Sequence, residues 1–362
     1  MKITGFRIGL LSARLRVPFK TALRTVNSVE DVVLELECSD GSTGRGEAPP
    51  TAAITGETTD SIIAALRDHI CPRLVGRDVA DFQALCEEVQ SALVGNSSAK
   101  AAADIALWDL YARSCALPVY KLLGGGVPLL VTDLTISVNE PAIMAKDAEY
   151  GVKCGYDVLK IKVGVDPGLD LARLKAVRGA AKDAKIRIDA NQAWTPRQAV
   201  RLLGQMQDAG LDIELVEQPV KARDIEGLRY VTANSPVPVM ADESVFTPQD
   251  ALKLMQERAA DLLNIKLMKC GGLTNALRIA SAAEVYGVEC MMGCMLEAKV
   301  SVTAAAHLAC AKRIITRIDL DGPALCSEDP VNGGAVFDGR EIRLPDAPGL
   351  GISGVNNIRY IV

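Results

Sequence analysis

Histidine is scarce in this sequence, with only His69 and His307 among 362 residues. His307 lies in an alanine-rich stretch typical of a helix, and His69 lies near the end of another predicted helix. Both positions favour structural or solvated histidines over catalytic ones. Any proton-transfer chemistry is therefore expected to use other side chains.

The sequence also lacks a basic block, and its net charge is -5, from 40 basic and 45 acidic residues. Nucleic acids and anionic membrane surfaces are therefore not expected as partners. No apolar stretch reaches the roughly 18 residues that a membrane span needs, and Met1 to Leu10 does not resemble a signal peptide. We expect a cytoplasmic protein whose ten scattered cysteines are reduced thiols.

Residues 126–325 show a regular spacing of short apolar runs separated by amphipathic stretches. The runs begin between 24 and 28 residues apart, near Val131, Val158, Ile186, Ile213, Val237, Leu262, Glu289 and Arg317. Strands alternating with helices at this spacing predict an α/β fold, a modified TIM barrel of the form (β/α)7β. A doubly wound open sheet is the alternative. The only glycine cluster, Gly124 to Gly126, precedes the first strand, whereas such a sheet usually has a glycine-rich phosphate loop after it.

Residues 1–125 have a different pattern and predict an α+β capping domain. Strands are expected at 3–16 and 29–38, and Asp40-Gly41 is a hairpin turn signal before a third strand at 43–47. Helices are expected near 58–71, 80–94 and 98–115, the last capped by Ser97 or Ser98. The tail, 326–362, has turn signals and no further βα unit, so we expect it to pack back on the capping domain.

Charged residues end six of the eight predicted barrel strands, where the functional residues of such barrels lie. They are sorted by sign, because lysines end strands two and six whereas acids end strands three, four, five and eight. In chain order they are Lys160 and Lys162, Asp189, Glu217, Asp242, Lys266, and Asp319 with Asp321. Strands two and six lie opposite each other in an eight-stranded barrel.

Three carboxylates on adjacent strands, Asp189, Glu217 and Asp242, would repel one another in a partly dry site. A hard divalent cation resolves that repulsion, and an all-oxygen ligand set suits Mg²⁺. We therefore predict one Mg²⁺ per subunit at these residues.

Lys160 and Lys162 are two residues apart on a strand, so they point the same way. Each is expected to lower the pKa of the other, and the bound metal adds to this effect. Lys162 is then a plausible neutral base, while Lys160 stays charged and binds a substrate carboxylate oxygen. With Lys266 on the opposite face, the pair can remove and return an α-proton through an enediolate, which predicts epimerisation or racemisation.

Five motifs resemble the muconate-lactonising subgroup of the enolase superfamily, and the resemblance covers nearly the whole chain. They are Lys160-Ile161-Lys162, Asp189-Ala190-Asn191, Glu217-Gln218-Pro219, Ala241-Asp242-Glu243-Ser244 and the segment from Lys266 to Gly272. The resemblance implies Mg²⁺ held by Asp189, Glu217 and Asp242, with Lys162 and Lys266 as the acid/base lysines.

Within the subgroup, Asp319-Leu320-Asp321 is similar to the dipeptide epimerases. Two carboxylates on one face make a site for the free ammonium group of a peptide. The segment from Pro18 to Thr25 resembles the specificity loop of the L-Ala-D/L-Glu epimerases, which implies that Arg24 binds a side-chain carboxylate. The segment Ile54 to Glu57 matches the same branch.

Three further residues, Thr135, Cys294 and Leu296, fall where the subgroup has substrate-lining residues. The resemblance thus implies an isomerase, a Mg²⁺-dependent epimerase of small dipeptides that forms a homo-oligomer. The substrate it favours is L-Ala-D/L-Glu, in murein peptide metabolism.

Three alternatives are a dipeptide epimerase of other specificity, a lyase or cycloisomerase such as o-succinylbenzoate synthase or muconate cycloisomerase, and a non-catalytic binder. The acid pair Asp319 and Asp321 argues against the lyases, whose substrates lack an ammonium group. The complete lysine set argues against the binder.

Overall fold

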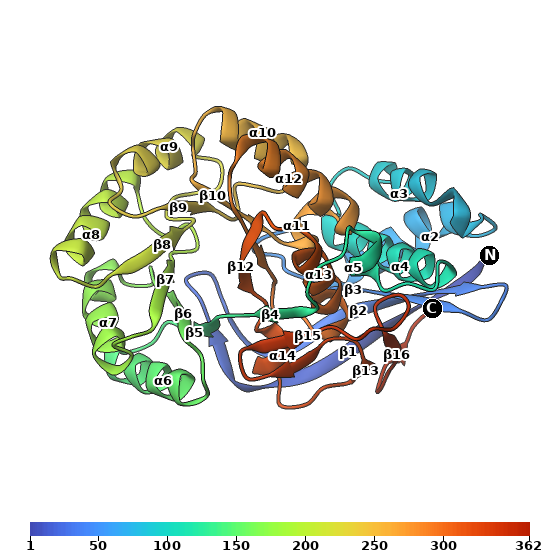
Figure 1. Ribbon diagram of the computed structural model, residues 1–362, viewed down its shortest axis with the longest axis horizontal. Coiled ribbons are helices and arrows are strands. Elements are labelled where there is room, and N and C mark those ends of the chain that lie inside the picture. The colour runs from blue at the N-terminus through green and yellow to red at the C-terminus, as the bar shows by residue number, and fades with distance from the viewer.

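The computed structural model describes all 362 residues and consists of a capping lobe and a parallel barrel (Figure 1). In the capping lobe, an antiparallel sheet has the order β17-β1-β2-β3. Its strands are β1 (Ile3–Lys20), β2 (Thr25–Cys38), β3 (Thr43–Ala48) and β17 (Arg359–Tyr360). The helical segments are α1 (Thr59–Ala64), the π-helix η1 (Ala65–Ile70), α2 (Cys71–Leu74), the 3₁₀ turn η2 (Val79–Asp81), α3 (Phe82–Ser91) and α4 (Ser97–Ser114). The sheet and these helices enclose a core of 24 buried apolar residues, separate from the 69-residue core of the barrel.

The first two strands are longer than the sequence pattern predicts. Phe19 pairs with Val26 and Lys20 with Thr25, so the expected loop at 18–25 is the tip of a hairpin in which only residues 21–24 lie outside the two strands. The barrel holds this tip in place. The backbone N–H of Lys20 donates to Ser137 Oγ at 3.0 Å, and the N–H of Val138 donates to the carbonyl of Lys20 at 3.2 Å.

Helix α4 begins as expected but is capped in another way. Asn96, in the left-handed region with φ 52°, precedes the helix and makes no side-chain cap, and neither Ser97 nor Ser98 caps it. The carboxylate of Glu57 instead accepts from the N–H groups of Ser98 at 2.9 Å and Ala99 at 3.1 Å. An acid distant in sequence thus accepts hydrogen bonds from the free N–H groups at the helix N-terminus and connects the loop before α1 to α4.

The barrel has eight parallel strands connected by seven helices, which confirms the (β/α)7β prediction. The strands are β5 (Leu134–Ile136), β6 (Val158–Lys162), β7 (Lys185–Asp189), β8 (Ile213–Glu217), β9 (Val239–Ala241), β10 (Leu262–Ile265), β11 (Cys290–Gly293) and β12 (Ile315–Asp319). The connecting helices are α6 (Pro141–Lys153), α7 (Pro167–Ala180), α8 (Pro196–Asp208), α9 (Ile225–Asn234), α10 (Pro248–Gln256), α12 (Leu273–Tyr286) and α13 (Lys299–Ala311), and α11 (Leu267–Cys270) is an extra turn after β10.

Local sequence explains where two of these helices start. Thr195 and Thr247 each cap the helix that follows, and a proline occupies the first helical position of both. The strands between the helices are almost wholly buried, as strands covered on both faces must be. The two ends of the sheet, β5 and β12, come close enough for the N–H of Asp133 to donate to the carbonyl of Ile318 at 3.3 Å, so the barrel is nearly closed.

The segment before the barrel contains α5 (Val119–Leu122) and β4 (Leu129–Val131). The helix α14 (Gly322–Leu325) follows the last barrel strand, and the tail contains β13 (Val331–Gly333), β14 (Val336–Asp338), β15 (Glu341–Arg343) and β16 (Ile352–Val355). It contacts both lobes, because β15 pairs with β4 next to the barrel whereas β17 pairs with β1 in the capping sheet. None of the helices is both long and apolar enough to cross a membrane.

Candidate active site

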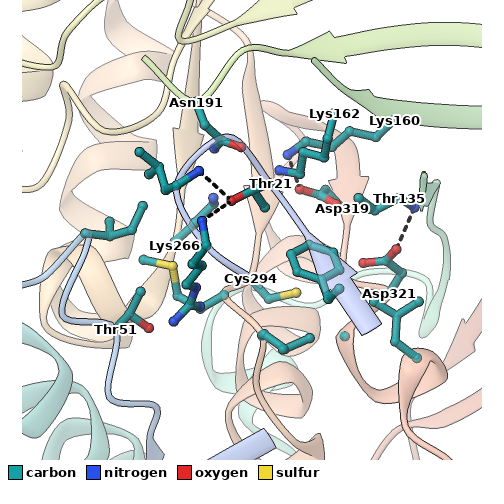
Figure 2. Close-up of a pocket in the computed structure, with 18 of the residues that line it drawn as sticks. Thr21, Thr51, Thr135, Lys160, Lys162, Asn191, Lys266, Cys294, Asp319 and Asp321 are labelled. Carbon is teal, nitrogen blue, oxygen red and sulfur yellow. Dashed lines mark hydrogen bonds and ion pairs between the residues drawn. The ribbon is translucent and has the colours of Figure 1, made fainter. Parts of the chain in front are cut away.

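A cavity of about 620 Å³, including its mouth, lies where the barrel strands end and the capping lobe covers them (Figure 2). Nine of the predicted site residues line it, namely Arg24, Thr135, Lys160, Lys162, Lys266, Cys294, Leu296, Asp319 and Asp321. The other three, Asp189, Glu217 and Asp242, make ion pairs with the lining lysines. Neither histidine lines this cavity.

The three acids meet because their strands are neighbours. Asp189 and Glu217 end β7 and β8, Asp242 directly follows β9, and each offers an oxygen within 4.8 Å of the others. All three are buried. Burial and the charge of Asp189 raise the pKa of Glu217 to about 8, because both disfavour its charged form. A buried, all-oxygen, anionic cluster of this kind fits Mg²⁺.

Two lysines flank the acids from opposite sides. Lys162 Nζ lies 2.6 Å from Asp189 Oδ2, and Lys266 Nζ lies 2.7 Å from Asp242 Oδ2. Lys162 ends β6 and Lys266 follows β10, and these strands are four places apart in a ring of eight. Figure 2 shows Lys266 on one side of the cavity and Lys162 on the other. A planar group between them would have an amine on each face.

Lys160 is almost fully buried, with 1% of its surface exposed, and three carboxylates surround it. Its Nζ lies 2.7 Å from Glu217 Oε2, 2.7 Å from Asp319 Oδ2 and 3.3 Å from Asp189 Oδ2. Burial lowers the pKa of Lys160, but the charges of Asp319, Glu217 and Asp189 outweigh burial and hold it well above the ordinary value. The three acids therefore outweigh any lowering by the neighbouring Lys162, and they favour the charged form of Lys160.

The second acid of strand eight has a different environment. Asp321 Oδ2 accepts the backbone N–H of Thr135 at 2.7 Å, the contact drawn at the right of Figure 2. Burial and the charge of Asp319 raise the pKa of Asp321 to about 6. Cys294 and Leu296, which follow β11, also line the cavity. This end of the cavity therefore combines two carboxylates with an apolar wall.

The capping lobe contributes one cation. Arg24 follows a tight turn in which the N–H of Thr21 donates to the Arg24 carbonyl at 3.0 Å. Thr21 Oγ1 accepts from the N–H groups of Leu23 at 3.1 Å and Arg24 at 3.3 Å. The Arg24 guanidinium lines the cavity and has no hydrogen-bond or ion-pair partner in the protein. Burial lowers its pKa, while the charge of Asp31 raises it.

Sequence reasoning assigned no role to two buried residues that hold the acids in place. Asn264 Nδ2 donates to Glu217 Oε1 at 2.9 Å, and Lys269 Nζ lies 2.5 Å from Asp242 Oδ1. The sequence did contain a sign of the role of Lys269, because this residue is the second lysine of the motif that starts at Lys266. Asn264 lies on β10, two residues before Lys266, which extends the strand by one residue, so both side chains point to the same side.

The sequence and structure were compared with known proteins. The chain is 56% identical to the L-Ala-D/L-Glu epimerase of Clostridium acetobutylicum, over 99% of this chain and 100% of that protein. It is similar to a solved substrate complex of the L-Ala-D/L-Glu epimerase from Bacillus subtilis, with a TM-score of 0.97, 48% identity and coverage of 98% and 99% of the two chains. It is also similar to the Enterococcus faecalis V583 dipeptide epimerase solved with Mg and L-Leu-L-Tyr, with a TM-score of 0.94, 43% identity and coverage of 98% and 100%.

Two family descriptions match the two lobes. Residues 7–124 match the N-terminal domain of mandelate racemase and muconate lactonizing enzyme. Residues 143–356 match the description "Enolase C-terminal domain-like". With this match and the acids and lysines at the ends of its barrel strands, the chain belongs to the mandelate racemase / muconate lactonizing enzyme family of the enolase superfamily.

Proposed function

We propose that this protein is a Mg²⁺-dependent dipeptide epimerase that inverts the α-carbon of the second residue, with L-Ala-D/L-Glu as its substrate. The observation that carries the proposal is the pair Lys162 and Lys266 on opposite sides of three convergent carboxylates. Relatives that cover the whole chain are named L-Ala-D/L-Glu epimerases, which supports the same activity.

Each part of a dipeptide has a complementary group in the cavity. The α-carboxylate lies next to Lys160 and the acid cluster, and the ammonium group lies between Asp319 and Asp321. Mg²⁺ held by Asp189, Glu217 and Asp242 supplies positive charge that stabilises the carboxylate as the α-proton leaves.

The two lysines transfer the proton. One neutral amine, on Lys162 or Lys266, takes the α-proton from its face and leaves a planar α-carbon. The ammonium group of the other lysine donates a proton to the opposite face, and the configuration inverts. Removal from one face and return to the other leaves the substrate's composition unchanged, so no oxidant or co-substrate is needed.

Arg24 supports an acidic second residue. It is an unpaired, largely buried guanidinium in the cavity wall, and such a group favours a carboxylate. A dipeptide epimerase of other specificity is the second candidate, because a relative 43% identical is named a hydrophobic dipeptide epimerase.

Deuterium exchange tests the proposal. The purified protein with Mg²⁺ and L-Ala-L-Glu in D₂O should incorporate one deuterium at the glutamate α-carbon and form L-Ala-D-Glu. Faster exchange into dipeptides with an apolar or basic second residue would contradict the proposed Ala-Glu specificity and would favour the epimerase of other specificity. Absence of exchange into every dipeptide tried would refute the epimerase activity itself. Lys266→Ala is the matched control for a contaminating enzyme, because the variant should no longer convert L-Ala-L-Glu into L-Ala-D-Glu.

We further infer a cytoplasmic homo-oligomer working on murein peptides. All ten cysteines are unpaired, which fits a reducing compartment.

We also infer that the chain divides into three parts, residues 1–125, 126–325 and 326–362, which the separate apolar cores of the two lobes support. Light scattering would measure the assembly, and limited proteolysis would map the boundaries.

A further inference from the structure

Thr51 is a cavity-lining residue that no catalytic step described above uses. It lies on the segment between β3 and α1, has 1% of its surface exposed and lines the same cavity as Arg24 (Figure 2). Its hydroxyl oxygen is buried and has no hydrogen-bond partner in the protein. A buried polar group without a partner is unfavourable, so its retention in a ligand cavity points to a partner on the ligand.

The local structure fixes Thr51 but leaves its hydroxyl free. Its backbone carbonyl accepts from the N–H groups of Ile54 and Thr55, both at 2.9 Å, and from Thr55 Oγ1 at 3.3 Å. The segment is anchored on both sides, because Ser98 Oγ donates to the Pro49 carbonyl at 2.9 Å and Glu57 caps α4. The turn is therefore stabilised by backbone contacts that do not need the Thr51 side chain.

The polar side chains of the capping lobe that line the cavity indicate which group of a ligand would bind to Thr51. The capping lobe provides three polar side chains to the cavity, on Thr21, Arg24 and Thr51. Thr21 Oγ1 already accepts two backbone N–H groups of its own turn. The Arg24 guanidinium and the Thr51 hydroxyl, in contrast, have no partner in the protein, and both can donate to a carboxylate. The barrel acids Asp319 and Asp321, which would bind an ammonium group, belong to the other lobe.

We propose that Thr51 is a specificity-determining residue, whose hydroxyl donates a hydrogen bond to the side-chain carboxylate of the second residue beside Arg24. The proposed role of Thr51 rests on the proposed function, since it assigns a contact to the side-chain carboxylate of that substrate. A site built to hydrogen-bond a substrate group discriminates strongly against analogues that lack the group.

Two substitutions and two substrates test the role. Thr51→Val keeps the shape and removes the hydroxyl, whereas Thr51→Ser keeps the hydroxyl. Rates are measured with L-Ala-L-Glu and with L-Ala-L-Met, whose side chain has a similar length and no charge. We expect Thr51→Val to lower kcat/KM for L-Ala-L-Glu about 10-fold, mainly through KM, with a much smaller change for L-Ala-L-Met. Thr51→Ser should restore most of the preference for glutamate.

The outcomes separate this inference from the proposed function. Wild-type protein that is inactive on L-Ala-L-Glu overturns both. Active wild type, with Thr51→Val losing the same factor on both dipeptides, overturns only the role of Thr51 and makes it structural. Thermal unfolding is measured for each variant, and Thr51→Ala takes the place of Thr51→Val if the latter does not fold. Arg24→Met is the positive control for a lost carboxylate contact.

Discussion

Lys160 and Asp319 form a buried ion pair, with Lys160 Nζ 2.7 Å from Asp319 Oδ2. The same amine contacts Glu217, so it connects the acid cluster to the pair of acids that ends strand eight. Asp321 forms no ion pair, and its Oδ2 accepts the backbone N–H of Thr135. The two acids of strand eight are therefore unequal, and Asp321 has the more available negative charge for a substrate ammonium group.

Asp321→Asn should accordingly raise KM for L-Ala-L-Glu about 10-fold or more, because it removes the charge that pairs with the ammonium group. Steady-state kinetics with the free dipeptide and its N-acetyl derivative measure this. Wild type should strongly prefer the free amine, and Asp321→Asn should lose most of that preference. An unchanged preference would place the ammonium group elsewhere, and full activity of the variant on an uncharged or anionic substrate would favour the lyases.

Lys162→Ala and Lys266→Ala should each lower the epimerisation rate by at least about 10²–10⁴-fold, since each variant lacks the acid or base on one face. The remaining lysine can still exchange the α-proton on its own side. We therefore expect each variant to exchange deuterium into only one of L-Ala-L-Glu and L-Ala-D-Glu, and into opposite ones. NMR in D₂O follows both reactions. Equal exchange into both epimers by either variant would contradict the assignment of one lysine to each face.

Mg²⁺ should raise the Tm by a few degrees, because it binds the folded acid cluster and relieves its repulsion. The measurement is thermal unfolding with EDTA and then with increasing Mg²⁺. Asp242→Asn should remove most of the shift. Asp68→Asn is a matched control, because Asp68 is exposed and its ion pair with Arg67 lies on the surface. A shift of equal size in Asp242→Asn would place the ion at another site.

His307 should make the fold sensitive to acid. It is fully buried on α13, its Nδ1 accepts the N–H of Tyr120 at 3.1 Å, and burial lowers its pKa from 6.5 to about 4. The unfolded chain binds this proton near pH 6.5 and the folded chain only near pH 4. Stability from the neutral histidine is thus complete above pH 6.5 and falls by about 3 kcal/mol by pH 4.

His307→Asn keeps an acceptor for Tyr120 but cannot be protonated. Urea unfolding at pH 6.5 and pH 4 compares the two proteins. The variant should be less stable at pH 6.5 and should lose less stability on acidification than wild type. Parallel losses would mean that His307 does not contribute to the acid sensitivity.

The barrel and its charged strand ends could be predicted because both depend on local patterns. Each strand has its own buried run, six of the eight have their own terminal charge, and the regular spacing of the runs indicates a repeating βα unit. The pairing of Lys160 with Asp319 could not be predicted, since it depends on how closely β6 and β12 approach after the ring closes. The roles of Thr51 and Glu57 could not be predicted either, because residues from distant segments of the chain determine which polar groups have hydrogen-bond partners.

The pairing of β17 with β1 has a consequence for how the protein folds during synthesis. Tyr360 lies opposite Gly9 and Arg359 opposite Leu10, so this part of the outer edge of β1 has no strand partner until residues 359 and 360 have been made. The capping lobe must remain an incomplete sheet with an open edge through the synthesis of the whole barrel, and open edges promote association between chains. Charged residues on β1, such as Arg7 and Arg14, would help to protect a nascent chain in that interval.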